Sequence, residues 1–283
     1  MSKPITITNI KTILTAPETI PLVVVKIETS EPGLYGLGCA TFTQRYLAVA
    51  TAIDEYLKPY LVGKDVANIE DIWQTSFVHS SWRNDAVLSN SVSGIDMALW
   101  DIKGKVAGMP VYDLLGGKAR AGAAVYRHAD GKSLSEVEEN VRKYMEQGLL
   151  YIRCQWGGYG GRIDQIKAPE NAPEGAYFDP HGYARNTVKL FDHIRNAVGD
   201  DIELLHDVHE RLAPIEAVRL SKNLEPYRLF FLEDALSPEA VDWFAVMRQQ
   251  SATPIAMGEL FTHPQEWLPL IQNRLIDFIR CHI

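Results

Sequence analysis

Apolar and polar residues alternate through the first part of the chain, and Gly or Pro divides the pattern into segments. Three of these are rich in β-branched or aromatic side chains, as is typical of strands, namely residues 5–15, 21–30 and 33–42. Because their connections are short, we expect an antiparallel meander. The apolar spacing then lengthens to a helical period over residues 44–61, 69–78 and 89–106.

From residue 123 onward, short apolar runs alternate with segments of helical period. The expected strands cover residues 123–130, 150–156, 202–210, 229–236, 254–260 and 276–283. The expected helices cover residues 133–148, 186–200, 214–227, 238–250 and 264–274. Strands that alternate with helices of this length indicate βα units and a parallel sheet.

The polar residues favour a barrel over an open sheet. An open dinucleotide-binding sheet carries Gly-x-Gly-x-x-Gly after its first strand, and this sequence has none there. Residues 157–162, GGYGGR, follow the second strand and are a weak signal for phosphate binding. The strands end in RHAD, RCQ, HDVHE, LEDA, GEL and RCHI. A barrel of the TIM type builds its active site from groups at that edge.

We therefore expect a TIM-like α/β barrel over residues 113–283, preceded by an α+β capping domain over residues 1–112. A closed barrel of eight units takes roughly 250 residues. Only six strands follow the expected boundary, so we expect the barrel to be truncated here and about two further βα units to follow Ile283 in the natural chain. In the last strand, Ile276, Phe278, Ile279 and Ile283 are expected to be buried.

Composition and charge restrict the class of protein. Hydrophobic residues make up 46% and charged residues 23% of the 283 positions, the mixture of a globular protein. The apolar runs are far shorter than the roughly 18 residues of a membrane span, and the N-terminus lacks a secretory signal. Three cysteines without CxxC spacing fit a reducing cytoplasm. A net charge of −8 argues against nucleic acid as a partner.

Three carboxylates stand at the same place in three consecutive units. Asp207 lies in LLHDVHE, Glu233 in FFLEDAL and Glu259 in AMGELF, with a spacing of 26 residues between each pair. Carboxylates brought together at a barrel mouth repel one another, and a divalent cation removes that conflict. Ligation by oxygen alone favours Mg²⁺. The alternative is that each carboxylate pairs separately with Lys or Arg.

These motifs, together with GMPVYDLLGGKAR at residues 108–120, resemble the mandelate-racemase-like branch of the enolase superfamily. Within that branch the chain is most similar to the D-mannonate dehydratase group. The resemblance implies a modified enolase barrel in which Asp207, Glu233 and Glu259 hold Mg²⁺. It also implies that a base removes the proton beside the carboxylate of an acid sugar, giving an enediolate.

The resemblance implies Arg153 and Tyr159 as the base. The branch commonly has Lys-x-Lys on the second strand, but here the strand ends in Arg153, Cys154 and Gln155. An adjacent guanidinium lowers the pKa of a tyrosine by favouring the phenolate. The alternatives are that Tyr159 is a loop aromatic on the barrel rim and that Arg153 pairs structurally with a carboxylate.

His209 matches the Asp-x-His pattern of the group and is the candidate acid for the departing hydroxyl. Two residues after Asp207 on an extended strand, it should project to the same face. His206 is expected to pack outward. The candidate substrate-binding residues are His128, Gln155, Arg280 and Trp82, although Trp82 is equally compatible with a surface aromatic on a capping-domain loop.

The resulting hypothesis is a Mg²⁺-dependent hydro-lyase that converts D-mannonate or D-gluconate to 2-keto-3-deoxy-D-gluconate. We expect a cytoplasmic homo-oligomer that binds a small acid sugar and neither nucleic acid nor membrane. One alternative is a dehydratase of another acid sugar, because the loops that line the pocket choose the stereoisomer. The other is a non-catalytic regulatory or ligand-binding relative, which the short WGGYGGR loop motivates.

Overall fold

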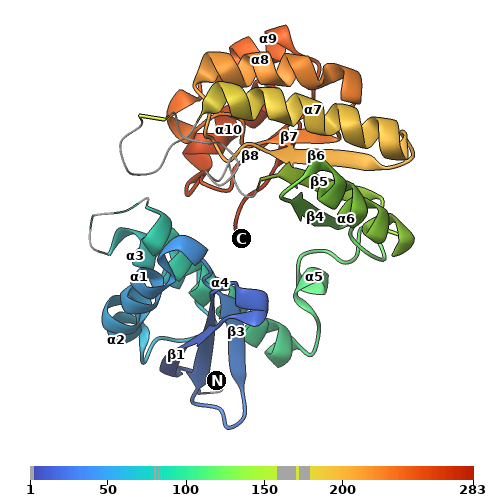
Figure 1. Ribbon diagram of the computed structural model, residues 1–283. Helices are drawn as coiled ribbons and strands as arrows, with labels where there is room; N and C mark the ends of the chain where they lie inside the picture. Colours follow the sequence, from blue (N-terminus) through green and yellow to red (C-terminus); the bar gives the residue numbers. More distant parts are fainter. Residues whose placement is uncertain (1–2, 80, 82, 84, 158–169, 172–178) are drawn as a thin grey trace. The chain divides into compact units, whose positions relative to one another are not determined.

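The computed structural model describes residues 3–79, 81, 83, 85–157, 170–171 and 179–283. Its internal contacts divide the chain into two compact units, which Figure 1 shows. The first contains residues 1–121 with the last two residues of the chain, and the second contains residues 122–281.

The first unit contains the expected antiparallel meander. Strands β1 (Ile7–Thr15), β2 (Leu22–Thr29) and β3 (Tyr35–Cys39) are hydrogen-bonded in that order. A 3₁₀ turn (Pro17–Thr19) connects β1 and β2. Apolar side chains alternate along β2, where Val23, Val25 and Ile27 are fully buried. This alternation places one face of the sheet in the core of the unit.

Helices cover that face. The expected helix over residues 44–61 is divided into a 3₁₀ turn (Thr43–Arg45), α1 (Tyr46–Thr51), a π-helical segment (Ala52–Leu57) and α2 (Lys58–Leu61). Pro59 lacks the amide that an α-helix needs, which accounts for the irregular hydrogen bonding before it. The other helices of the unit are α3 (Ile69–Val78), α4 (Ala86–Ala107) and α5 (Val111–Leu114).

Strand β3 lies directly against α4, and glycines make this contact possible. A Cβ atom at Gly38 would overlap the carbonyl oxygen of Gly94, and one at Gly36 would overlap that of Ala98. Asp85 caps the start of α4 by accepting hydrogen bonds from two amides, and Gly108 ends the helix with φ = 68°. Helix α4 therefore contains the helical segment expected over residues 89–106 and begins three residues before it.

Replacing Gly38 by alanine is expected to lower the free energy of unfolding by about 2 kcal/mol, because the new methyl group must push α4 away from the sheet. Urea unfolding followed by circular dichroism measures the change. Gly122→Ala is the matched control, since no heavy atom lies within 4 Å of a Cβ placed there. Equal midpoints of urea unfolding for Gly38→Ala and Gly122→Ala would contradict the close packing of β3 against α4.

The second unit is a parallel α/β structure. In its described residues, six strands are hydrogen-bonded in chain order: β4 (Tyr126–Gly131), β5 (Tyr151–Trp156), β6 (Glu203–Asp207), β7 (Phe231–Glu233), β8 (Ile255–Met257) and β9 (Phe278–Ile279). The intervening helices are α6 (Leu134–Glu146), α7 (Pro180–Val198), α8 (Pro214–Leu224), α9 (Trp243–Gln250) and α10 (Pro264–Gln272). Two 3₁₀ turns cover Glu225–Tyr227 and Pro238–Ala240. Figure 1 shows α7, α8 and α9 along one side of the strands, as in the expected TIM-like barrel, and the fold class is confirmed.

Both faces of the inner strands β5 to β8 are buried. On the side of the helices, residues such as Ile152 and Leu204 pack against Phe191 and Phe244. A smaller cluster on the inner side contains Leu205, Phe231 and Ala256, packed with Tyr126, Tyr151 and Phe230. Burial on two faces explains why the strands read as apolar runs until they reach their carboxyl ends.

His206 and Cys154 lie on the side of the helices, as expected for His206. The His206 Nδ1 atom donates to the carbonyl oxygen of Cys154 at 2.9 Å, and its Nε2 atom lies 2.8 Å from the hydroxyl of Tyr183 on α7. The Cys154 side chain is fully buried, and burial raises the pKa of its thiol to about 12.

The burial of His206 predicts a pH-dependent stability. Burial lowers the pKa of His206 from 6.5 to about 4, although its bond to Cys154 opposes the shift. In the unfolded chain His206 therefore binds a proton as the pH falls through 6.5, whereas in the folded chain it stays neutral until about pH 4. The free energy of unfolding consequently decreases as the pH falls over that interval. Against His206→Gln, the stability advantage of the wild-type chain should shrink by about 3 kcal/mol between pH 7 and pH 4 in urea unfolding. A difference that stays constant with pH would contradict this.

Several boundaries and one burial pattern differ from the expectations. Helix α7 begins at Pro180, capped by the side chain of Asp179, and not at residue 186. Strand β6 ends at Asp207, because the next residues turn away. In the last strand Ile276 is buried as expected, but the expected burial of the other residues is wrong: the exposed fractions are 36%, 40% and 86% for Phe278, Ile279 and Ile283. For Phe278 and Ile279 the reason is that β9 pairs only with β8 among the described strands.

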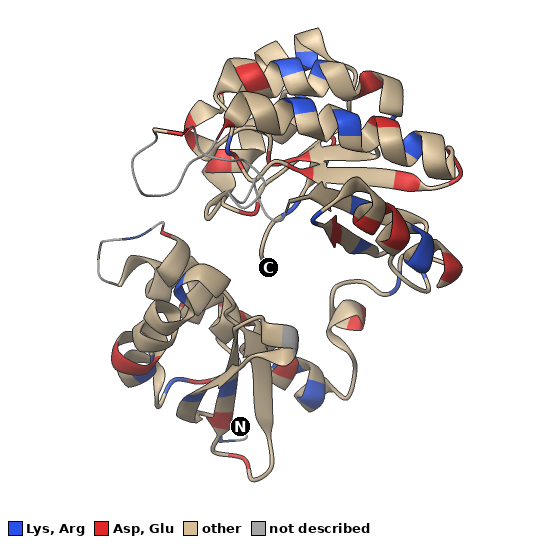
Figure 2. Cartoon of the chain, viewed as in Figure 1, with Lys and Arg blue, Asp and Glu red and all other residues tan. Residues whose placement is uncertain are grey.

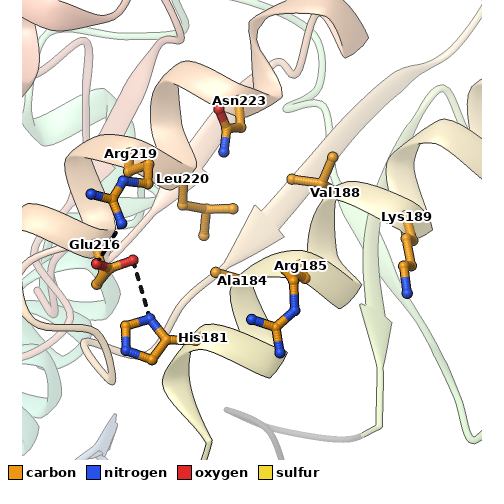
Figure 3. A pocket seen from close by; sticks show the side chains of 9 residues that line it. All are labelled: His181, Ala184, Arg185, Val188, Lys189, Glu216, Arg219, Leu220 and Asn223. Carbon is orange, nitrogen blue, oxygen red and sulfur yellow. Dashed lines mark hydrogen bonds and ion pairs between the residues drawn. The ribbon is translucent and has the colours of Figure 1, made fainter.

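A groove of about 410 Å³ lies between α7 and α8 on the helical side of the second unit (Figure 3). Arg185 and Lys189 line it from α7, and Figure 2 shows Lys and Arg positions on both helices. Glu216 forms ion pairs with Arg219 at 2.8 Å and with His181 at 3.6 Å. No residue of the groove belongs to the strand ends.

Among the described residues, no helix is both long and apolar enough to cross a membrane.

Candidate active site

The candidate site residues that the structure describes lie on the strands β4 to β9 or directly after them. They are His128 on β4, Arg153 and Gln155 on β5, Asp207 at the end of β6, His209 after it, Glu233 at the end of β7, Glu259 after β8 and Arg280 after β9. Gln155 is fully buried. Tyr159 and Trp82 lie outside the described residues, so their roles stay predictions.

A buried ion pair joins β5 and β6. The Nη1 atom of Arg153 donates to Oδ2 of Asp207 at 2.7 Å, and the exposed fractions of the two side chains are 2% and 0%. The Nη2 atom of Arg153 lies 3.3 Å from Nδ1 of His128. Partial burial, and then the charge of Arg153, lower the pKa of His128 to about 4, so a neutral imidazole accepts this hydrogen bond. The structural pairing of Arg153 with a carboxylate is thus present.

His209 lies beside Asp207, as expected, but the two residues are not on one face of an extended strand. Strand β6 ends at Asp207, and His209 has φ = 53°, a left-handed conformation. Its amide donates to Oδ1 of Asp207 at 2.9 Å, and its Nε2 atom lies 3.1 Å from Oδ2. The expectation of an extended strand through residue 210 is therefore wrong, because this turn folds His209 back onto the carboxylate.

Arg280 lies between the other two carboxylates. Its Nε atom is 2.9 Å from Oε1 of Glu233, and its Nη1 atom forms an ion pair with Glu259. Glu233 is fully buried, and neither of its oxygens accepts a hydrogen bond of good geometry from the described residues. Burial, and then the charge of Asp207, raise the pKa of Glu233 to about 7. Burial by itself lowers the pKa of Arg280, but the charges of Glu233 and Glu259 raise it above its usual value.

The three predicted ligands stand on adjacent strands, and Asp207 is directly opposite Glu233 in the pairing of β6 with β7. Within the described ranges, however, no three acidic, histidine or cysteine side chains converge closely enough to hold a metal ion. Arg153 is ion-paired with one carboxylate and Arg280 with the other two, which lowers the repulsion among the three. The donor chemistry still fits a hard divalent cation, since it consists of carboxylate oxygens, among them the poorly hydrogen-bonded pair of Glu233.

Comparison with known proteins supplies the family. Residues 1–116 match the mandelate racemase/muconate lactonizing enzyme N-terminal domain, and residues 136–283 match the enolase C-terminal domain-like family. The chain is 59% identical to a D-galactonate dehydratase family member of Pantoea ananatis, over 98% of this chain and 70% of that protein. It is 58% identical to such a member of Salmonella virchow, over 98% and 70%.

The chain belongs to the D-galactonate dehydratase family.

Solved structures agree with this family and superfamily. The crystal structure of an enolase from Pantoea ananatis with bound D-gluconate and Mg has a TM-score of 0.92 and 59% identity, covering 99% of this chain and 71% of that one. The 3,6-anhydro-D-galactonate cycloisomerase of Zobellia galactanivorans has a TM-score of 0.80 and 25% identity, over 98% and 72%. Membership in a dehydratase family of the enolase superfamily confirms the expected superfamily and the class of hydro-lyase. The narrower D-mannonate dehydratase group stays a prediction.

The sequence pattern does not select two further acidic residues of this dehydratase family member, Asp234 and Glu210, which lie near the predicted ligands. Asp234 is fully buried, and its Oδ1 atom accepts from the amide of Gly258 at 3.1 Å. Burial, and then the charge of Asp207, raise its pKa to about 9. Burial, and then the charge of Glu259, raise the pKa of Glu210 to about 8. Glu210 and Asp234 belong to the same sequence motifs as the predicted ligands Asp207 and Glu233. The repeat of 26 residues, however, selects only one acidic residue at each strand end.

Proposed function

We propose that this chain is a Mg²⁺-dependent dehydratase of an acid sugar, D-mannonate or D-gluconate, and that the product is 2-keto-3-deoxy-D-gluconate. The observation that carries the proposal is the set of carboxylates at three consecutive strand ends, two of them fully buried. D-gluconate and Mg in the related crystal structure support the same class of ligand and cofactor. Asp207, Glu233 and Glu259 would hold the ion.

Bound Mg²⁺ supplies positive charge for the substrate carboxylate, which makes the neighbouring C–H bond more acidic. The phenolate oxygen of Tyr159 then accepts that proton. Asp207 and His128 hold the guanidinium of Arg153 in place from two sides, and this cation would favour the phenolate form of Tyr159. Arg153 would then have two roles, since it pairs with Asp207 and also stabilises the phenolate of Tyr159.

His209 would give a proton to the hydroxyl that departs from the next carbon, so that water leaves and the resulting enol tautomerises to the 2-keto product. Burial, and then Arg153, lower the pKa of His209 to about 4 in the unliganded chain. The negative charge of a bound sugar acid opposes that shift and favours the imidazolium. The 3.1 Å contact with Asp207 orients the ring for this transfer.

The substrate's polar groups would be bound by His128, Gln155, Arg280 and Trp82. Assembly into a homo-oligomer also stays a prediction, which sedimentation velocity tests. Which stereoisomer binds depends on loops around the mouth of the barrel, so gluconate and mannonate are the first pair to compare.

A steady-state assay of the chain with Mg²⁺ and a panel of acid sugars tests the proposal. We expect turnover of about 1 s⁻¹ or more on one of them, and loss of turnover with a chelator. Glu233→Gln should abolish activity, whereas Glu146→Gln, at an exposed position at the end of α6, should not. Binding of the acid sugar without turnover would favour a ligand-binding relative instead.

A further inference from the structure

Two arginines neutralise the carboxylates of the candidate site, and they differ in how tightly they are held. The side chain of Arg153 is 2% exposed and is bonded to Asp207 on one side and His128 on the other. The side chain of Arg280 is 41% exposed and reaches Glu233 and Glu259 from the edge strand. Of the two guanidinium groups, that of Arg280 is the more accessible to solvent, so it is the one that a bound cation can replace.

The backbone at Arg280 cannot move as freely as its side chain. The Arg280 amide donates to the carbonyl oxygen of Met257 at 3.0 Å. A Cβ atom at Gly258 would overlap the carbonyl oxygen of Arg280, and Gly258 has φ = 139°, where side chains are strongly disfavoured. Because these contacts fix the backbone of Arg280, a change in the position of its partly exposed guanidinium need not disturb the sheet.

We infer that Arg280 is an internal counter-cation for Glu233 and Glu259 that a divalent cation displaces, and that its release provides a binding group for the substrate's carboxylate. This inference rests on the proposed function. It predicts that binding is ordered, with the metal ion before the acid sugar. The same guanidinium cannot satisfy the two glutamates and an incoming carboxylate at once, because its donors lie in one rigid fork.

Charge balance supports this order. With Arg153 and Arg280 in place, the three carboxylates are left with one uncompensated negative charge, which repels an anionic sugar acid. A divalent cation on the carboxylates, together with Arg153, neutralises them completely. The released guanidinium then contributes a positive charge at the barrel mouth, which attracts the sugar acid.

Isothermal titration of the chain with MgCl₂ alone tests the first part. Arg280→Met should bind Mg²⁺ about tenfold more tightly than the wild type, because no internal cation competes, and Arg280→Lys should lie between the two. Arg219→Met is the matched control, since it removes an ion-paired arginine on α8 outside the site, and its Mg²⁺ affinity should equal that of the wild type. Unchanged or weaker affinity in Arg280→Met would overturn the inference.

Titration with sodium D-gluconate tests the second part. The wild type should bind gluconate at least tenfold more weakly in EDTA than in MgCl₂, and Arg280→Met should bind it weakly in both. Equal binding by the wild type in both buffers would overturn the ordered sequence. If the acid sugar turns over while Mg²⁺ affinity is unchanged in Arg280→Met, the inference fails and the proposed function stands. If the wild type neither binds Mg²⁺ nor turns over any acid sugar, both fail.

Discussion

Replacing Arg153 by methionine is expected to lower the free energy of unfolding by about 3–5 kcal/mol, because it leaves the carboxylate of Asp207 buried without its partner. Both side chains are almost completely inaccessible to water, so solvent cannot replace the lost charge. His128 also loses the donor that its Nδ1 atom contacts at 3.3 Å. Urea unfolding at pH 7 in the presence of EDTA measures the loss without a contribution from bound metal.

The double variant Arg153→Met, Asp207→Asn separates charge from packing. Removing the unpaired charge should restore part of the stability, because a neutral amide is less costly to bury than a carboxylate. Arg142→Met, which breaks an exposed ion pair with Glu138, serves as the control and should change stability by less than about 1 kcal/mol. If Arg153→Met and Arg142→Met lost similar amounts of stability, burial of the ion pair between Arg153 and Asp207 would not determine its contribution to stability.

Replacing His209 by asparagine is expected to slow dehydration by a factor of about 10² to 10⁴ while Mg²⁺ affinity stays close to that of the wild type. The imidazole is the candidate proton donor for the leaving hydroxyl, and asparagine has no group that titrates near neutral pH. The backbone turn should persist, since asparagine tolerates the left-handed conformation observed at this residue. Measurement of kcat and KM on the preferred acid sugar, with parallel titration of Mg²⁺, gives both quantities.

His181→Asn is the control for this variant. It replaces a histidine that is 63% exposed and lies in the groove between α7 and α8, so kcat should not change. Full activity in His209→Asn would place the proton donor elsewhere. A large loss of Mg²⁺ affinity would instead mean that the contact between His209 and Asp207 is needed to position the metal ligands.

The alternation of strands and helices could be read from the sequence because the second unit buries its strands on both faces. Runs such as the one before Glu233 contain only apolar residues, and the first polar residue marks the end of the strand. The meander of the first unit is equally clear in the sequence, since β2 alternates between buried and partly exposed positions from Leu22 to Glu28. These signals are local, which is why single-sequence patterns contain them.

The details of the site depend on features that no local pattern contains. His209, Glu210 and Asp234 are non-glycine residues with positive φ, and it is these turns that bring their side chains to the strand ends. The contact of Arg280 with Glu233 and Glu259 joins residues up to 47 positions apart through a long side chain. Strand pairing brings β7, β8 and β9 together, but the rotamer of Arg280, and hence the carboxylates that it contacts, depends on the charges around its side chain.

The buried thiol of Cys154 provides a reporter of local opening that requires no engineered label. A thiol with a pKa raised to about 12 and no solvent exposure does not react with an alkylating reagent while β5 stays in the sheet. The exposed thiols of Cys39 and Cys281 react first and mark the completion of surface modification. The slow third alkylation, followed by mass spectrometry, then reports how often the sheet opens beside Arg153, and ligand binding at the strand ends should slow it.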